Sequence, residues 1–217
     1  MPQLLGPFAN TFSRVVLGAI IAGPLIIVAA LVGFQWSPAA TGQGDALEQP
    51  IPFSHKHHVG EMGLDCRYCH ATVETTAFAG MPSTHVCMTC HSQLFTDVPM
   101  LAPVRASLAQ DKPLVWNRVN VLPDYVYFDH SIHIAKGVGC AECHGPVHDM
   151  PLMRQAEPLS MGWCLSCHRD PGPHLRAQAA ITDTTFVAHN APTKARALVR
   201  AYHIDSAHLT DCSVCHR

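Results

Sequence analysis

Five copies of a short cysteine and histidine pattern constrain this chain more than any other feature of its sequence. All ten cysteines fall in C-x-x-C-H pentads, and none is left over for another purpose. The two residues between the cysteines differ in every pentad, so the constraint rests on the cysteines and the histidine alone. The cysteine pairs are Cys66/Cys69, Cys87/Cys90, Cys140/Cys143, Cys164/Cys167 and Cys212/Cys215, and the histidines that follow them are His70, His91, His144, His168 and His216.

This spacing is that of a c-type haem attachment site. Two thiols two residues apart bond the two vinyl groups on one edge of the macrocycle, and the next histidine binds the iron as its fifth ligand. A zinc ribbon needs two cysteine pairs for each metal and no histidine after each pair. A disulfide framework gives no reason for the five histidines, and a thioredoxin-like redox pair occurs once, beside a βαβ pattern that is absent here. The pentads therefore predict five covalently bound haem c groups.

The low aromatic content leaves little side-chain material for a large core, so we expect the cofactors to form part of the core. The 217 residues carry a formal net charge of −2, so there is no basic surface to bind nucleic acid, and aromatic residues make up only 7%. We expect a mostly α and irregular fold with little or no sheet, in which short helices carry the pentads and the haems form most of the core.

An apolar segment precedes the pentads. Residues 15–34 contain no charged side chain over 20 positions, which is about 30 Å of helix and one hydrocarbon thickness. We predict a transmembrane anchor over 15–36, a cytoplasmic N-terminus over 1–14, an exposed linker over 37–50, and a haem domain over 51–217 on the periplasmic side. A cleaved signal peptide is the competing interpretation, because small residues follow at 37–40.

The haem domain contains an internal repeat. Phe53, His55 and His58 form an F-x-H-x-x-H pattern ahead of the first pentad, and Phe128, His130 and His133 repeat it ahead of the third. A spacing of three places both histidines on one face of a helical turn, where they can serve as sixth ligands of two haems. The pattern resembles that of small multihaem cytochromes of the c3/c7 kind. It predicts duplicated two-haem modules over 53–91 and 128–168, with a fifth haem over 203–217.

The sixth ligand of the fifth haem stays open at this point. His203 and His208 precede the last pentad by nine and four residues, which makes them the first candidates. A methionine would raise the potential of that haem relative to bis-histidine neighbours. The other candidates are His57, His85, His148, His174, His189, Met150, Met153 and Met161; His57 lies off the face shared by His55 and His58 and is expected on the surface.

Three segments together with the anchor and the pentads carry a family resemblance. Residues 122–133, 140–147 and 161–169 resemble the pentahaem cytochrome c subunit of bacterial alternative complex III, a quinol:electron-acceptor oxidoreductase. The resemblance implies an electron-transfer subunit rather than the catalytic site itself. It also implies three kinds of partner in the same membrane complex, namely an iron–sulfur subunit, polytopic quinol-binding subunits and a monohaem cytochrome c.

Other multihaem functions remain as alternatives. A stand-alone membrane-anchored quinol dehydrogenase of the NapC/NrfH kind has typically four haems, and the fifth pentad and the duplicated units argue against it. A multihaem reductase needs one iron with an open sixth position, against which the many spare histidines speak. A cytochrome that feeds a photosynthetic reaction centre usually has four haems with methionine ligands. No nucleophile triad, phosphate loop or carboxylate pair is legible, so we expect no hydrolytic or group-transfer chemistry.

Overall fold

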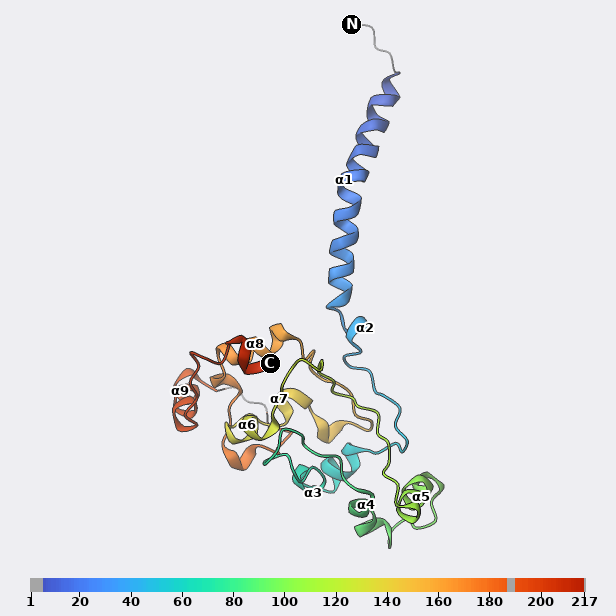
Figure 1. The fold of residues 1–217 in the computed structure, drawn as a ribbon, viewed down its shortest axis with the longest axis vertical. Coiled ribbons are helices and arrows are strands. Elements are labelled where there is room, and N and C mark those ends of the chain that lie inside the picture. The colour runs from blue at the N-terminus through green and yellow to red at the C-terminus, as the bar shows by residue number, and fades with distance from the viewer. Residues whose placement is uncertain (1–5, 187–189, 217) are drawn as a thin grey trace. The chain divides into compact units, whose positions relative to one another are not determined.

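The chain divides into an N-terminal helical unit and a larger cysteine-bearing unit (Figure 1). The structure is a computed structural model that describes residues 6–186 and 190–216. The first unit covers residues 1–43 and the second covers 44–217.

Helix α1 (Pro7–Gln35) dominates the first unit. It begins after Gly6 with proline at its first position, where the missing N–H costs no hydrogen bond. Its 29 residues give a length of about 43 Å, and an 18-residue window within Phe8–Gln35 reaches a mean hydropathy of 2.8, with none of that window buried in the chain. Helix α1 is thus long and apolar enough to cross a membrane. It starts eight residues before the predicted anchor, because the polar first turns are also helical.

Short helices and turns joined by long loops build the second unit, as Figure 1 shows. The short α2 (Pro38–Thr41) closes the first unit at Gly42, which adopts a left-handed conformation. The elements of the second unit are the π-helix η1 (Lys56–Glu61), α3 (Cys66–Cys69), α4 (Thr84–His91), η2 (Pro99–Leu101), α5 (Ala102–Gln110), α6 (His130–Ala135), α7 (Ala141–His144), η3 (Val147–Asp149), α8 (Met161–Arg169), η4 (Gly172–His174), η5 (Gln178–Ala180), α9 (Pro192–Ala201) and α10 (Cys212–Cys215).

Within residues 6–186 and 190–216 there is no β-sheet. Three isolated antiparallel bridges, Ala46 with Arg154, Val126 with His216 and Val138 with Leu175, are the extended pairings found there. The predicted fold class, mostly helical and irregular with little or no sheet, is confirmed.

The protein part of the core is small. Its buried cluster consists of Val73, Ile134 and Ile181, against which Ala79 and Cys140 pack. Elsewhere close backbone contacts replace side-chain packing. At Gly60 an added Cβ would lie 2.2 Å from the carbonyl oxygen of His148, so only glycine lets η1 approach η3 this closely. So few buried apolar side chains leave room for cofactors to complete the interior.

Candidate haem sites

All five pentads fold as helical turns, which places the two thiols of each pair on one face. Helices α3, α4, α7, α8 and α10 carry them in chain order. Asp65 caps α3 by accepting from the Arg67 backbone N–H, and Ser160 caps α8 by accepting from the Trp163 N–H. Local capping chemistry thus fixes where these two turns begin.

The ten cysteines are unpaired and none is fully buried. Free cysteine is ordinarily among the most buried residue types, so ten accessible thiols in one chain are unusual. This is the arrangement that thioether attachment to an external group requires.

The histidine of each pentad is held through its Nδ1 atom. In four of them Nδ1 donates to a backbone carbonyl, which leaves Nε2 free to bind a metal. The pairs are His70 with Gly80 O (2.7 Å), His91 with Leu94 O (3.2 Å), His168 with Leu209 O (2.8 Å) and His216 with Tyr125 O (3.2 Å). A carbonyl partner on one ring nitrogen is the usual way in which a protein orients a histidine ligand.

His144 is held by a side chain instead. Its Nδ1 lies 3.1 Å from the amide nitrogen of Asn120, and the Asn120 Oδ1 is buried without a partner. With the amide turned by 180°, Oδ1 accepts from Nδ1–H, which satisfies both groups and frees Nε2 as in the other four. Burial, followed by the neighbouring His130, His70 and His55, lowers the pKa of His144 to about 4. The imidazole is therefore neutral, as a metal ligand must be.

The two F-x-H-x-x-H turns adopt nearly the same ring geometry. Phe53 meets His55 edge-on at 4.9 Å and 88°, and stacks on His58 at 4.4 Å and 24°. Phe128 repeats this, with His130 at 4.7 Å and 89° and His133 at 4.5 Å and 29°. Each phenylalanine thus fixes two imidazoles at once, one by its edge and one by its face.

Three of these histidines face the histidine of a pentad. Ring centres lie 6.2 Å apart for His58 and His91, 6.3 Å for His130 and His144, and 6.2 Å for His133 and His168. With metal–imidazole bonds of about 2.0 Å and roughly 1.1 Å from ring nitrogen to ring centre, the ring centres of two imidazoles on one metal lie about 6.2 Å apart. The separations fit an iron between each pair. The partners of Nδ1 are again carbonyls, Ser54 O, Ala77 O and Asp129 O.

His55, the fourth histidine of the two F-x-H-x-x-H turns, lies near the histidine of the first pentad. Burial, followed by the nearby His70 and His58, lowers the pKa of His55 to about 4, so its neutral ring lies beside the histidine of the first pentad. Its Nδ1 is buried without a hydrogen-bond partner. His57, two residues after His55, is exposed and bonds Glu61 at 2.8 Å, as expected of a surface residue.

Among the described residues, neither His203 nor His208 makes a ring contact with His216. His208 bonds Asp211 at 3.1 Å and its side chain is 74% exposed. His203 adopts a left-handed backbone with φ of 49° after α9. Over residues 6–186 and 190–216 the ring found against His216 is that of Tyr125, at 5.8 Å. His189 lies outside the described residues.

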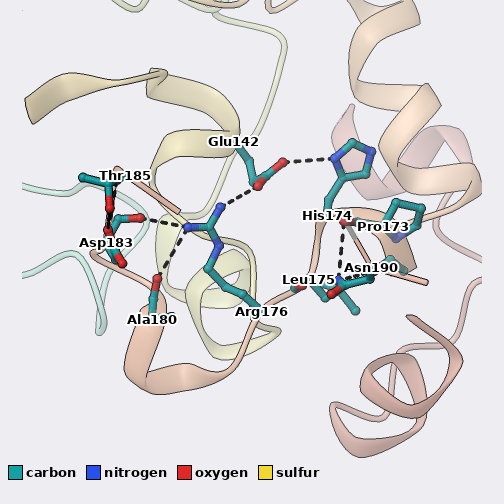
Figure 2. Close-up of polar contacts among 10 residues, drawn as sticks. Glu142, Pro173, His174, Leu175, Arg176, Ala180, Asp183, Thr185 and Asn190 are labelled. Atoms are coloured by element: carbon teal, nitrogen blue, oxygen red, sulfur yellow. Dashed lines mark hydrogen bonds and ion pairs between the residues drawn. The ribbon is translucent and has the colours of Figure 1, made fainter. Parts of the chain in front are cut away.

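A buried ion pair lies inside the third pentad, and sequence reasoning missed it. Figure 2 shows the Glu142 carboxylate between Arg176 and His174. Oε1 accepts from Arg176 Nη2 at 2.5 Å and Oε2 lies 3.1 Å from His174 Nδ1. The Arg176 side chain is fully buried, and its guanidinium occupies the space that a Cβ at Gly139 would fill. The sequence offered one indication of this ion pair, which is the position of a charged residue, Glu142, between two attachment cysteines.

Comparison with known proteins gives two partial family matches. Residues 51–107 match the family described as cytochrome c7 and related cytochrome c, and residues 119–213 match the cytochrome c552 family. A subunit of Nitratidesulfovibrio vulgaris described as "menaquinone reductase, multiheme cytochrome c subunit" is 39% identical over 119 residues, which are 54% of this chain and 55% of that protein. The chain is a relative of the multihaem cytochromes c.

These matches confirm part of the sequence analysis. The chain contains a c7-like region over the first F-x-H-x-x-H turn and the first two pentads, and the matched cytochrome families indicate haem c as the cofactor type. The chain is related to a menaquinone reductase subunit over 119 residues, and its described residues contain one candidate membrane helix. The cytochrome spans about half the length of the curated relative it matches. The number of haems, the assignment of each ligand and the kind of complex stay predictions.

Proposed function

We propose that this cytochrome is the five-haem electron-transfer subunit of a quinol:acceptor oxidoreductase of the alternative complex III kind. The observation that carries the proposal is the set of three imidazole pairs at 6.2–6.3 Å. An iron held by two histidines would have no open position for a substrate and would serve as an electron carrier. The same feature argues against a reductase that works at an open iron.

Each protein group has a definite task in this proposal. The ten pentad cysteines would attach the macrocycles. The pentad histidines would each bind one iron, and four further histidines would bind four of the same irons. The pentad histidines are His70, His91, His144, His168 and His216, and the four further ones are His55, His58, His130 and His133. Bound haem c supplies a one-electron Fe(III)/Fe(II) couple. The carbonyls on Nδ1 keep each imidazole in one tautomer and orientation, and the two phenylalanines hold the paired rings in place.

Helix α1 supports a membrane location. We propose that it anchors the chain with the haem domain on the periplasmic side, because c-type haems are attached on the outer face of bacterial membranes. The relative is described as a menaquinone reductase subunit, which supports a quinone/quinol couple as the redox partner, and we propose that electrons flow from quinol in this complex. In the proposed complex quinol oxidation releases two electrons and two protons at polytopic subunits. An iron–sulfur subunit and a monohaem cytochrome c are the further partners.

Purification of the full-length chain in mild detergent tests the proposal. We expect five haems c per chain by pyridine haemochrome assay, and an iron–sulfur protein and polytopic subunits among the co-purifying chains by mass spectrometry. A count below five overturns the five-haem assignment. A chain that is isolated alone with five haems and oxidises quinol itself is instead a stand-alone dehydrogenase.

A further inference from the structure

The contacts among the pentads give the five haem sites an order in space, which rests on the proposed five-haem function. We number the sites 1 to 5 by their pentads along the chain. Sites 1 and 2 are joined through η1, because His55 lies beside His70 while His58, one turn on, faces His91 at 6.2 Å. The Tyr68 hydroxyl of pentad 1 also bonds Thr89 of pentad 2 at 2.8 Å. Sites 1 and 2 are therefore direct neighbours.

Sites 3 and 4 are joined in the same way through α6. His130 faces His144 of pentad 3 and His133 faces His168 of pentad 4, at 6.3 and 6.2 Å. Since the two histidines stand on one helical turn, they hold the two sites side by side.

Sites 1 and 3 connect the two modules. Two cysteines donate hydrogen bonds to adjacent carbonyls of one loop. The thiol of Cys66 in pentad 1 donates to Thr182 O, and the backbone N–H of Cys140 in pentad 3 donates to Ile181 O. The two thiols also hydrogen-bond to each other. In addition, His130 donates from both its backbone N and its Nδ1 to Ala77 O, just beyond pentad 1. The sites that meet between the modules are thus 1 and 3.

Pentad 2 lies on the outer side of this junction. In the described part of the chain, Cys87, Cys90 and His91 make no hydrogen bond, ring contact or thiol contact with pentads 3, 4 or 5. The thiol neighbour of Cys87 is Cys69 of pentad 1. Pentad 1 thus separates pentad 2 from the second module.

Site 5 follows site 4. The Nδ1 of His168 in pentad 4 donates to Leu209 O at 2.8 Å, three residues before pentad 5. The thiols of Cys164 and Cys215 are electrostatic neighbours. Pentad 5 is held in turn by Tyr127, whose backbone N–H donates to Cys215 O at 2.8 Å, directly before the second F-x-H-x-x-H turn.

We propose that the five haem sites stand in space in the order 2–1–3–4–5. The electron path then differs from the order along the chain, and sites 2 and 5 are its two ends. These are the sites at which electrons enter from one partner and leave to the other, while sites 1, 3 and 4 exchange electrons only within the chain.

His55→Met and His58→Met test this order in the full-length cytochrome loaded with haem. A methionine ligand raises the potential of its haem, so that site takes up an electron first in a reductive titration and becomes diamagnetic. Its neighbours then lose one magnetic coupling, which electron paramagnetic resonance detects. We expect His58→Met to change the signal of one other haem and His55→Met to change the signals of two. These variants are matched, because both replace the same residue type in the same turn.

The order along the chain makes the opposite prediction. If His55→Met changes one signal and His58→Met changes two, the proposed order is overturned. If either variant loses its haem, or if the new methionine does not bind the iron, the iron positions in an electron cryomicroscopy map of the unmodified protein decide the order of the sites. The iron of site 1 must lie between those of sites 2 and 3, and an iron of site 2 between sites 1 and 3 refutes the order. A haem count below five would instead refute the proposed function.

Discussion

The two F-x-H-x-x-H turns share their ring geometry and differ in what surrounds it. Phe53 and Phe128 contact their histidines at distances that agree within 0.2 Å and at angles that agree within 5°. The backbones differ, because His55 precedes the π-helix η1 whereas His130 begins the α-helix α6. The duplicated sequence thus gives the same arrangement of the phenylalanine and histidine rings even though the helix type differs.

The second contacts of the histidines separate the two turns. His130 donates its Nδ1 to Ala77 O in the first module, whereas the Nδ1 of His55 is buried without a partner. The third position of the pentads differs as well. Tyr68 in pentad 1 makes a neutral bond to Thr89, and Glu142 in pentad 3 makes an ion pair with buried Arg176. Local sequence sets ligand geometry, and the tertiary neighbours set the charge and hydrogen bonds around it.

Removing one sixth ligand in each turn is expected to have the largest effect. His58→Ala and His133→Ala should each convert one low-spin haem to the high-spin form, because the sixth position opens. Electron paramagnetic resonance of the oxidised protein measures this. The effect should be equal in the two turns, and His57→Ala, one position from His58, should leave the spectrum unchanged. An unchanged low-spin count in His133→Ala would contradict the ligand assignment.

Breaking the ion pair tests the difference between pentads 1 and 3. Glu142→Gln leaves the charge of Arg176 buried without a partner. We expect a loss of about 3 kcal/mol in the free energy of unfolding, the low end for a buried ion pair, because the Glu142 side chain is 17% exposed. Tyr68→Phe should cost only about 0.5–1.5 kcal/mol for one neutral hydrogen bond. Chemical denaturation of the holoprotein measures both.

The double variant Glu142→Gln/Arg176→Met serves as the control for the ion pair. Removal of both charges should restore most of the lost stability. If the double variant is no more stable than Glu142→Gln, the loss came from packing rather than from the unpaired charge.

The phenylalanines test the similarity of the two turns. Phe53→Ala and Phe128→Ala each remove two aromatic contacts, so we expect a loss of about 1–3 kcal/mol in each case. Equal losses by denaturation, together with broadened haem signals in magnetic resonance, would sharpen the parallel. A loss of stability in only one variant would show that the same ring geometry contributes differently to the stability of the two modules.

The smallest expected effect is a pH dependence at the Glu142–His174 pair. The hydrogen bond that His174 donates to the Glu142 carboxylate raises the pKa of His174 above its ordinary value of 6.5. A raised folded-state pKa stabilises the fold fully below pH 6.5, and this contribution is lost as the pH rises through the folded-state pKa. His174→Gln should therefore lower the melting temperature more at pH 6 than at pH 9. A difference that is constant across this range argues against the protonated pair.

The pentads, the apolar N-terminal helix and the F-x-H-x-x-H repeat could be recognised from the sequence alone, because attachment chemistry and helical spacing act within a few residues. The prediction of a mostly helical, sheet-free fold followed from the same local patterns and is confirmed. The comparisons confirm the relation to multihaem cytochromes c, while the five haems and their individual ligands remain predictions.

Only the tertiary structure decided which imidazoles face each other and which pentads touch. The partners of His168, His216 and Cys66 lie 41, 91 and 116 residues away along the chain. No local spacing encodes such contacts, since they arise when loops without regular pattern fold around the sites. For the same physical reason the sequence showed Glu142 as a residue between two cysteines, and only the fold placed Arg176 and His174 against it.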